Sequence, residues 1–331
     1  MCTAATYHTK DHYFGRNLDY EFSYHETVTI TPRHKHFSFR HQGDTAQHYA
    51  MIGMAFVLND YPLYYDATNE KGLSIAGLNF PDNAHYFPVQ DDKTNVASFE
   101  LIPWLLGSCA TIEDVKAKLE TINITNDAFS DELPPSPLHW MIADQKQVIV
   151  FEQTADGGKV YDNPFGVMTN NPTFDYHLTH IQDYLHTSAA MPQNTMAKEV
   201  ETNFYSRGMG GIGIPGDLSS ASRFVKVAFT KMNAVSGDSE EDSVTQFFKI
   251  LGSVEQQKGC CFIGTDDKGQ AFYEHTIYSS CCNIDQGIYY YTTYHNPTII
   301  GIDMYQEDLD SEDLISYELE KETHLYLANQ K

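Results

Sequence analysis

Short runs of apolar and β-prone residues dominate the first 80 residues of the chain. Two of these runs, 2–8 and 12–20, flank Thr9-Lys10-Asp11, and this arrangement predicts a β-hairpin. Further strands are expected at 27–32, 49–57, 63–67 and 72–80, and later in the chain at 137–144, 147–153, 158–162, 271–280, 287–294 and 297–304.

Helical patterns occupy the segments between these strands. Thr111 and Asp114 form a capping-box-like start for a helix over 111–122. Acidic residues after Ser239 suit the first turn of a helix over 240–254. The other expected helices cover 97–108, 173–185 and 221–234. Strands, then helices, then strands predict an α+β layered fold on antiparallel sheets, because a parallel α/β fold would alternate single strands with single helices.

The balance of charge excludes two classes of partner. The 331 residues include 21 basic and 45 acidic ones, and the formal net charge is −24. Such a chain would be repelled by nucleic-acid backbones and by anionic lipid surfaces. Apolar runs such as 99–106 are too short to span a bilayer, and residues 1–10 do not resemble a signal peptide. We therefore expect a cytoplasmic protein with no nucleic-acid or membrane partner.

A cytoplasmic location would keep the six cysteines reduced. The adjacent pairs 260–261 and 281–282 do not look like a disulfide framework. Neighbouring residues of a strand point to opposite faces, so neither pair readily gives two ligands to one metal ion. We expect both pairs to be buried as small apolar residues.

Cys2 combines two chemical groups that can act together. An initiator Met is usually removed when the next residue is small, and its removal would leave Cys2 with a free α-amine. That amine has an ordinary pKa of about 8, so near neutral pH it can accept a proton from the thiol. An acyl group can then pass to sulfur and be hydrolysed. The alternative is a Met-Cys start without a catalytic role.

The second strand carries two charged residues, Arg16 and Asp19, within an otherwise apolar run. If the hairpin loop has three residues, Cys2 faces Leu18, Arg16 shares the face of Cys2, and Asp19 points away. A two-residue loop reverses that choice. The sequence leaves the register open, and it also allows a solvated Arg-Asp pair on an outer face.

Five motifs together resemble a known enzyme family. They are MCT at 1–3, FGRNLDY at 14–20, NEKGLSIAGLNFP at 69–81, GVMTNNPTF at 166–174 and LSSASRFVKVAF at 218–229. In this order, after a cysteine at position 2, they resemble the choloylglycine hydrolase and penicillin V acylase family of N-terminal-nucleophile hydrolases. The resemblance implies one domain over 1–331 and a four-layer αββα fold with two antiparallel sheets. It also implies a homotetramer that needs no cofactor or metal.

The resemblance assigns roles to the residues of the first hairpin. Cys2 would be the nucleophile, and its own amine would be the base. Asp19 would orient the amine and the thiol, while the positive charge of Arg16 would favour the thiolate.

Three further residues take roles by the same resemblance. The side chain of Asn170 and the backbone N–H of Asn79 would form the oxyanion hole, and Arg223 would support the charge balance. Both asparagines stand at strand ends, where they could also be ordinary turn residues. Arg223 falls in the first turn of an expected helix, where a cation opposes the helix dipole. This placement points to a carboxylate or thiolate partner, and the alternative is a solvated arginine.

The resemblance also predicts the walls of a substrate pocket. The matching residues are apolar or aromatic, as a steroid face requires, although such residues would equally fill a core. They are Leu18, Leu58, Tyr65, Phe129 and Leu133. The leading expectation is hydrolysis of the amide that joins a bile acid to glycine or taurine. Penicillin V acylases of the family often carry Tyr at the position of Asn79, so this activity is the second choice, and a non-catalytic acidic binding protein is the third.

Two other patterns do not support a cofactor or a metal. Residues 208–213 match G-x-G-x-x-G, but no apolar strand precedes them and Ile214-Pro215-Gly216 follows where a helix should begin. His177 and His180 share one face of an expected helix, with His186 nearby, but no cysteine or carboxylate completes a familiar ligand spacing.

Overall fold

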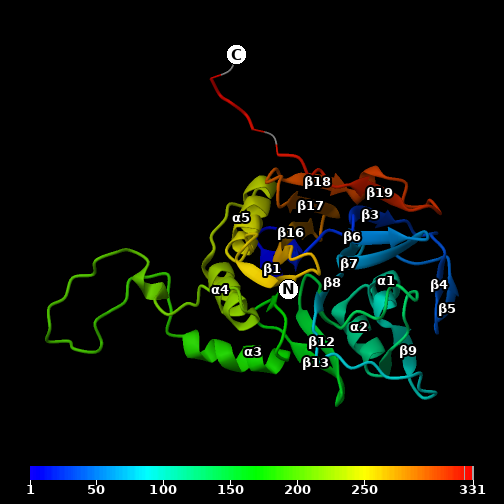
Figure 1. Ribbon diagram of the computed structural model, residues 1–331, viewed down its shortest axis with the longest axis horizontal. Coiled ribbons are helices and arrows are strands. Elements are labelled where there is room, and N and C mark those ends of the chain that lie inside the picture. The colour runs from blue at the N-terminus through cyan, green and yellow to red at the C-terminus, as the bar shows by residue number, and fades with distance from the viewer. Residues whose placement is uncertain (324, 330–331) are drawn as a thin grey trace.

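Two large antiparallel sheets face each other at the centre of the protein (Figure 1). The computed structural model describes residues 1–323 and 325–329. The first sheet has seven strands, and β15 pairs with the outer part of β16. In spatial order they are β14 (Val167–Met168), β1 (Cys2–His8), β2 (His12–Tyr20), β16 (Ala271–Asn283), β17 (Ile288–Thr293) and β18 (Ile300–Asp303), with β15 (Cys261–Thr265) beside β16.

The second sheet has eight strands and includes the hairpins of the first third of the chain. In spatial order they are β13 (Gly157–Asp162), β12 (Val148–Thr154), β11 (Leu138–Ala143), β8 (Ser74–Asn79), β7 (Tyr61–Asn69), β6 (Met51–Leu58), β3 (Thr27–Thr31) and β19 (Ile315–Glu318). Two small sheets pair β4 (Phe37–Phe39) with β5 (Gly43–Thr45), and β9 (Thr94–Ala97) with β10 (Ile122–Thr125).

Helices cover the outer faces of both sheets, which confirms the four-layer αββα fold (Figure 1). The helices α4 (Ser220–Asn233) and α5 (Glu240–Gly252) pack on the first sheet, and α1 (Leu101–Ser108) and α2 (Ile112–Leu119) on the second. The short α3 (Phe174–His180) runs on into a 3-10 turn, Ile181–Tyr184, and packs against α4. Other 3-10 turns are Ser98–Glu100, Met209–Gly211 and Met304–Gln306.

The buried apolar side chains form two clusters that follow these layers. One cluster fills the space between the sheets and the space beneath α4 and α5. The other lies between the second sheet and α1 with α2. Cys2 and Leu18 belong to the first cluster, so one face of the first hairpin is buried in the core. This packing holds the hairpin's side chains in fixed positions.

Both capping signals of the sequence are confirmed. Thr111 and Asp114 bond each other's backbone in a complete capping box, and Ser239 accepts a hydrogen bond from the backbone N–H of Asp242. The α-helix expected from residue 97 begins only at Leu101, because Ala97 pairs with β10 as the last residue of β9 and Ser98–Glu100 form a 3-10 turn. Pro103 consequently lies in the first turn, where the missing N–H costs nothing.

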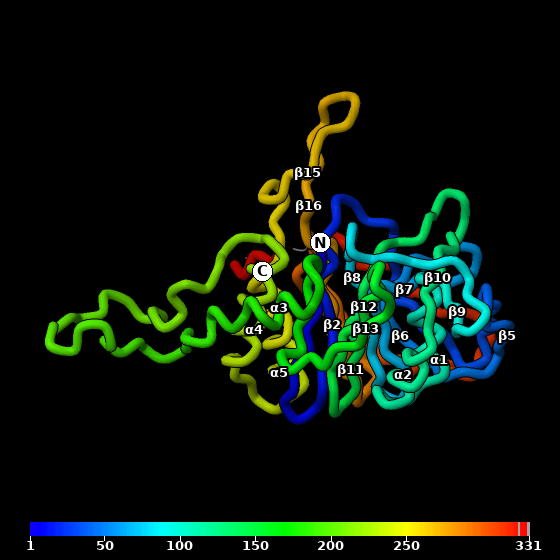
Figure 2. The backbone as a smooth tube through the Cα atoms, turned by 90° about the horizontal axis from the view of Figure 1, so that it is seen from below, coloured from blue at the N-terminus to red at the C-terminus, as the bar shows by residue number. Residues whose placement is uncertain are grey.

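The interpretation of Cys260 and Cys261 as buried residues is wrong. Cys260 is exposed and Cys261 is half-buried, whereas Cys281 and Cys282 are buried as expected. The difference arises because β15 and the first half of β16 form a hairpin that projects from the body (Figure 2). Within this hairpin, Phe262 is 61% exposed, so apolar sequence there does not mean burial.

A long arm over residues 185–216 also leaves the body (Figure 2). The glycine pattern at 208–213 lies in this arm, around the 3-10 turn Met209–Gly211. Several large apolar side chains on the arm are exposed, among them Met196 at 96% and Tyr205 at 85%. Among the described residues, no helix combines the length and the apolar character needed to cross a membrane.

Candidate active site

The register of the first hairpin places Arg16 beside Cys2. His8 pairs with His12 and Cys2 pairs with Leu18, so the loop has the three residues Thr9 to Asp11. Side chains alternate along a strand, and Arg16 and Leu18 therefore share the face of Cys2 between the two sheets. The structure thus decides between the two registers that the sequence left open.

Arg16 joins the thiol of Cys2 to the second sheet. Its Nη2 donates to Sγ of Cys2 over 2.6 Å, and its Nη1 donates to the carbonyl oxygens of Tyr65 and Gly77 over 3.0 and 2.6 Å. Pairing between β7 and β8 ends at Asp66 and Ala76, and the guanidinium enters where these strands separate. Burial lowers the pKa of Arg16, but nearby negative charge, chiefly that of Cys2, outweighs burial and raises the pKa overall. Arg16 is therefore a permanent cation at the sulfur.

Asp66 is a buried acid close enough to act on Arg16 through its charge, and the sequence analysis missed it. Its carboxylate accepts hydrogen bonds from Tyr278 and Tyr289 over 2.8 and 2.7 Å, and from Ser280 over 3.2 Å. Burial raises the pKa of Asp66, while the charge of Arg16 and these hydroxyl donors oppose the rise. The sequence does contain a sign of this residue, because Asp66 is a single acid within the apolar and aromatic run of β7.

Asp19 lies on the opposite face of β2 from the thiol. Its buried carboxylate accepts hydrogen bonds from Thr276 over 2.6 Å and from Gln256 over 3.2 Å, and none of its described hydrogen bonds goes to Cys2. Burial raises the pKa of Asp19, and the charges of Arg223 and of the amino terminus oppose this. The structure therefore brings Arg16 to the sulfur, whereas Asp19 acts on the amino-terminal region through its charge.

The amino terminus lies at the open end of the first hairpin, beside the base of the projecting hairpin. The amine of Met1 donates to the carbonyl oxygen of Asp19 over 2.8 Å and forms an ion pair with Glu274. Burial lowers the pKa of this amine. The backbone nitrogen of Cys2 donates to Oδ1 of Asn170 over 2.8 Å.

Asn170 is held in one orientation by Arg223. Nη2 of Arg223 donates to Oδ1 of Asn170 over 2.8 Å, and Nη1 donates to the carbonyl oxygen of Cys2 over 2.5 Å. A guanidinium only donates, so the amide oxygen must face it and Nδ2 must face the other way. There Nδ2 donates to the carbonyl oxygen of Asn79 over 2.7 Å. Burial lowers the pKa of Arg223, while Asp19 and Cys2 raise it.

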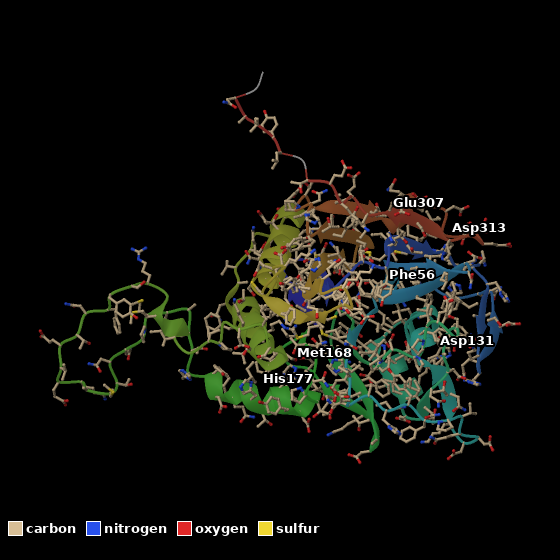
Figure 3. The ribbon with its side chains drawn as sticks, in the orientation of Figure 1. Phe56, Asp131, Met168, His177, Glu307 and Asp313 are labelled. Atoms are coloured by element: carbon tan, nitrogen blue, oxygen red, sulfur yellow. The ribbon has the colours of Figure 1, made fainter. Side chains whose placement is uncertain are left out.

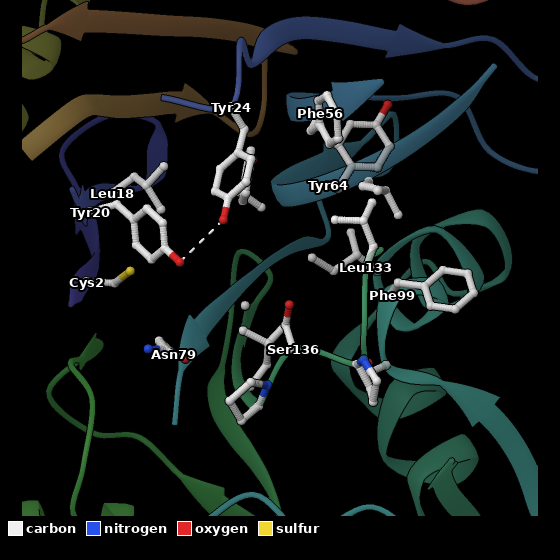
Figure 4. Close-up of a pocket in the computed structure, with 18 of the residues that line it drawn as sticks. Cys2, Leu18, Tyr20, Tyr24, Phe56, Tyr64, Asn79, Phe99, Leu133 and Ser136 are labelled. Carbon is white, nitrogen blue, oxygen red and sulfur yellow. Dashed lines mark hydrogen bonds between the residues drawn. The ribbon is translucent and has the colours of Figure 1, made fainter. Parts of the chain in front are cut away.

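Asn79 is the last residue of β8 and lies near Cys2 in the close-up (Figure 4). The next backbone N–H, that of Phe80, donates to the carbonyl oxygen of Pro137 on the side of β11. Successive N–H groups of a strand point to opposite sides, so the N–H of Asn79 points away from β11. Asn79 and Asn170 are neighbours, because Nδ2 of Asn170 donates to the carbonyl oxygen of Asn79. Their role as an oxyanion hole stays a prediction.

A cavity of about 290 Å³ reaches Cys2 from between the sheets (Figure 4). Four of the five predicted wall residues line it: Leu18, Tyr65, Phe129 and Leu133. Leu58 does not, because it pairs with Tyr61 at the tip of the β6–β7 hairpin. The cavity runs from Cys2 towards Phe99 and Leu133 on the opposite side of the close-up.

Sequence reasoning missed several residues of this cavity. They come from loops and from strand faces that only folding brings together: Tyr20, Tyr24, Phe56, Leu63, Phe99, Ile102, Pro134, Pro135 and Pro137. The hydroxyls of Tyr20 and Tyr24 lie 3.4 Å apart and form the polar contact drawn in Figure 4. The rest of the wall is chiefly apolar, so the cavity suits a rigid hydrocarbon skeleton more than a sugar or a nucleotide.

Comparison with known proteins agrees with this geometry. Residues 2–317 match the model of the family described as linear amide C–N hydrolases, choloylglycine hydrolase family. A bile salt hydrolase/transferase of Lactiplantibacillus plantarum is 53% identical over 329 residues, covering 99% of this chain and 100% of the relative. A bile salt hydrolase/transferase of Clostridium perfringens is 36% identical, covering 97% of this chain and 98% of the relative.

Two solved structures resemble the fold. A variant of conjugated bile acid hydrolase from Clostridium perfringens matches with a TM-score of 0.89 and 34% identity, over 99% of this chain and 100% of that one. A penicillin V acylase from Agrobacterium tumefaciens matches with a TM-score of 0.73 at 17% identity, over 98% of this chain and 100% of that one, which shows the fold alone. With the family model and the relatives in agreement, this chain belongs to the choloylglycine hydrolase family of linear amide C–N hydrolases.

Proposed function

We propose that this protein hydrolyses the amide bond of bile salts conjugated to glycine or taurine, with Cys2 as nucleophile. The observation that carries the proposal is the thiol of Cys2, which receives a hydrogen bond from a buried arginine at the end of a chiefly apolar cavity. The printed names of the relatives support the same substrate class.

Removal of Met1 would turn the backbone nitrogen of Cys2 into a free amine. This nitrogen already donates to Oδ1 of Asn170, a contact that would keep its lone pair aimed in one direction. The amine takes the proton of its own thiol, and the charge of Arg16 stabilises the thiolate that results. The carboxylate of Asp19 would stabilise the ammonium form through its charge, without contacting the sulfur.

The thiolate then attacks the carbonyl carbon of the amide, and negative charge collects on the carbonyl oxygen. Nδ2 of Asn170 has two hydrogens, and only one is engaged, by the carbonyl of Asn79. The second hydrogen and the backbone N–H of Asn79 would hold the oxyanion. One donor of this kind lowers a barrier by about 3 kcal/mol. Arg223 would contribute by fixing which way the amide of Asn170 points.

The tetrahedral intermediate collapses when the C–N bond breaks. The ammonium of Cys2 gives its proton to the departing nitrogen, so glycine or taurine leaves as a neutral amine and a thioester remains on sulfur. The amine, now free, removes a proton from water, which attacks the thioester. The C–S bond breaks, the bile acid leaves, and the ammonium of Cys2 returns its proton to the sulfur, which restores the thiol.

The cavity supports a steroid as the acyl part of the substrate. Its volume of about 290 Å³ is near the lower end for small-molecule sites, which span about 300–1,000 Å³. We propose that Leu18, Tyr65, Phe129 and Leu133 contact the ring system. At about 25 cal/mol per Å², burial of roughly 200 Å² of steroid would contribute about 5 kcal/mol to binding.

The test is incubation of the purified protein with glycocholate, taurocholate and penicillin V. We expect release of glycine and taurine, detected by an amine reagent, and much slower release of phenoxyacetate. Faster cleavage of penicillin V would assign the chain to the acylase activity instead. Binding of glycocholate without any release, in protein whose mass begins at Cys2, would favour a non-catalytic role.

We further propose that four copies assemble. The exposed apolar side chains of the arm over 185–216 support this, because a free monomer would leave them in water. Light scattering after gel filtration should give a mass near four times 37.5 kDa. A monomer at micromolar concentration would refute the assembly.

The cysteines support a cytoplasmic location for the protein, which we also propose. All six are free thiols, and Cys260 is exposed. A reducing compartment would preserve them. Fractionation of the source cells should recover the activity with cytoplasmic markers, and recovery in the medium would contradict this.

A further inference from the structure

The loop that carries Asn170 is held at its backbone by two buried histidines. Nε2 of His177, on α3, lies 2.9 Å from the carbonyl oxygen of Asn170. Nε2 of His139, on β11, lies 2.9 Å from the carbonyl oxygen of Thr169. A carbonyl oxygen only accepts, so each Nε2 carries a hydrogen and donates it. Two consecutive carbonyls around the key asparagine are therefore fixed by imidazoles from different elements.

His177 is a fixed support and does not face solvent. His177, labelled in Figure 3, is buried on α3, and its ring stacks on Phe224 at 5.0 Å between centroids. Burial lowers the pKa of His177 to about 4, which keeps the ring neutral with its hydrogen on Nε2. The backbone N–H of Asn170 donates to Oγ of Ser220 over 2.8 Å. Both backbone polar groups of Asn170 are thus satisfied by side chains outside its own loop.

His139 is fixed from its other side by Glu152. Nδ1 of His139 lies 3.0 Å from Oε1 of Glu152, and a proton must lie between them because two lone pairs at that distance would repel. Both side chains are fully buried, and the ring of His139 stacks on Phe80 at 4.2 Å. The carboxylate also accepts from the backbone N–H of Phe174, at the start of α3. Glu152 thereby ties the far end of the same loop to the second sheet.

We propose that His177 and His139 are positioning residues for amide hydrolysis, which hold the backbone of Asn170 so that its amide reaches the amine of Cys2 and the oxyanion. The inference rests on the proposed function of Asn170. Asn170 lies outside any strand, past the end of β14, so no sheet ladder fixes its backbone. Misplacement by about 1 Å is enough to lower a rate by orders of magnitude.

The test replaces the donor while keeping the ring. His177→Phe retains the stacking partner of Phe224 but cannot donate to Asn170. We expect kcat for glycocholate to fall about tenfold, the loss of one well-placed hydrogen bond, with KM changed less than about twofold. His177→Gln can still donate near the same point and should restore most of the rate. His180→Phe, on the same helix, is the matched control and should keep kcat within about twofold of the parent. The ring of His180 stacks on Tyr176 and has no described hydrogen bond to this loop.

A double-mutant comparison separates positioning from general damage. If His177 acts through Asn170, His177→Phe should change kcat less than about twofold when Asn170 is already Ala. A tenfold loss in both backgrounds, or no loss in the parent, would overturn the proposal. If His177→Phe does not fold, His139→Phe takes its place in the same comparison, because it removes the donor to Thr169 and keeps a ring that can stack on Phe80.

The hydrogen bonds of the two histidines can also be tested without an activity assay. Nitrogen NMR of the imidazoles should find the hydrogen of His177 on Nε2, protected from exchange. A hydrogen on Nδ1 of His177 would mean that this ring does not donate to the carbonyl oxygen of Asn170, and it would overturn the proposal. A correct tautomer together with full activity of Asn170→Ala would instead refute the role of Asn170 in the proposed function, which keeps the two failures distinct.

Discussion

The guanidinium of Arg16 donates to the sulfur of Cys2 over 2.6 Å, and the two residues lie on the same face of one hairpin. Nη1 of the same guanidinium donates to the carbonyl oxygens of Tyr65 and Gly77, at the point where β7 and β8 separate. A cation held this firmly cannot swing away from the sulfur. The hairpin therefore carries the nucleophile, and the second sheet fixes the group that stabilises its charge.

Processing of the amino terminus should control activity. The mature chain should begin at Cys2, because only then is the nitrogen that bonds Asn170 a basic amine. Mass spectrometry of active protein checks this. Protein that retains Met1 should be inactive and should gain activity after treatment with a methionine aminopeptidase. Full activity of a chain with Met1 in place would disprove the amine's role.

Replacement of Cys2 by Ser should abolish most activity without unfolding the protein. A hydroxyl is far less acidic than a thiol, so the amine and Arg16 cannot produce enough alkoxide, and kcat should fall by more than about a hundredfold. The exposed Cys260 is the matched control, and Cys260→Ser should keep full activity. Cys2→Ala should bind glycocholate without cleaving it. Rapid turnover by Cys2→Ser would remove the thiol from the mechanism.

Removal of the amide of Asn170 should affect the rate more than binding. We expect Asn170→Ala to lower kcat by about a hundredfold or more with a smaller change in KM, since its donor matters most when charge develops on the substrate oxygen. Steady-state kinetics with taurocholate measure both constants. A change confined to KM would make Asn170 a binding residue of the ground state.

Phe129 should contribute equally to the hydrolysis of glycine and taurine conjugates. It packs against Phe99 at 5.2 Å between ring centroids, and Phe99 lies across the cavity from Cys2 (Figure 4). With the scissile amide at Cys2, the ring system that both conjugates share would reach Phe129, and the amino-acid head would not. Phe129→Ala should lower kcat/KM about tenfold for glycocholate and for taurocholate alike. Leu58→Ala, outside the cavity, should change it less than about twofold. A loss confined to one conjugate would place Phe129 at the head group.

Stability should fall on acidification in a way that depends on His177. Its pKa in the folded protein is about 4, below the ordinary value of 6.5, so between these two pH values the unfolded chain binds more protons and stability drops as the pH falls. The full effect is about 3 kcal/mol, reached near pH 4. Denaturant unfolding from pH 7 to 4 should show a steeper loss for the parent than for His177→Phe. Parallel losses in the two proteins would contradict the assignment.

The local pattern of the chain determined where most elements lie. Alternating β-prone runs bounded by turn residues predicted β1 and β2 with the bounds that the structure has, and capping residues marked the starts of α2 and α5. These signals depend on neighbours in the sequence, so they can be read before folding. The family motifs also indicated Cys2, Arg16, Asn79, Asn170 and Arg223, which the structure brings together.

The short strands and the walls of the cavity were beyond local reasoning. β9 and β14 are brief and gain their pairing from distant partners, and the loops that carry Tyr24 and Pro134 have no periodic pattern. Leu58 looked suitable because it is apolar, but a leucine at a hairpin tip and one in a cavity wall have the same sequence signature.

The sequence by itself determined that Cys2 could be a nucleophile, because a small residue after Met and a thiol beside a potential amine are properties of the chain. Only the tertiary structure decided which charge reaches the sulfur. The two hairpin registers differ by one loop residue, and a slip of one position moves every side chain to the opposite face. Burial of Arg16 between the sheets, where two carbonyls and the thiol accept its hydrogens, fixes the register that places Asp19 on the far side.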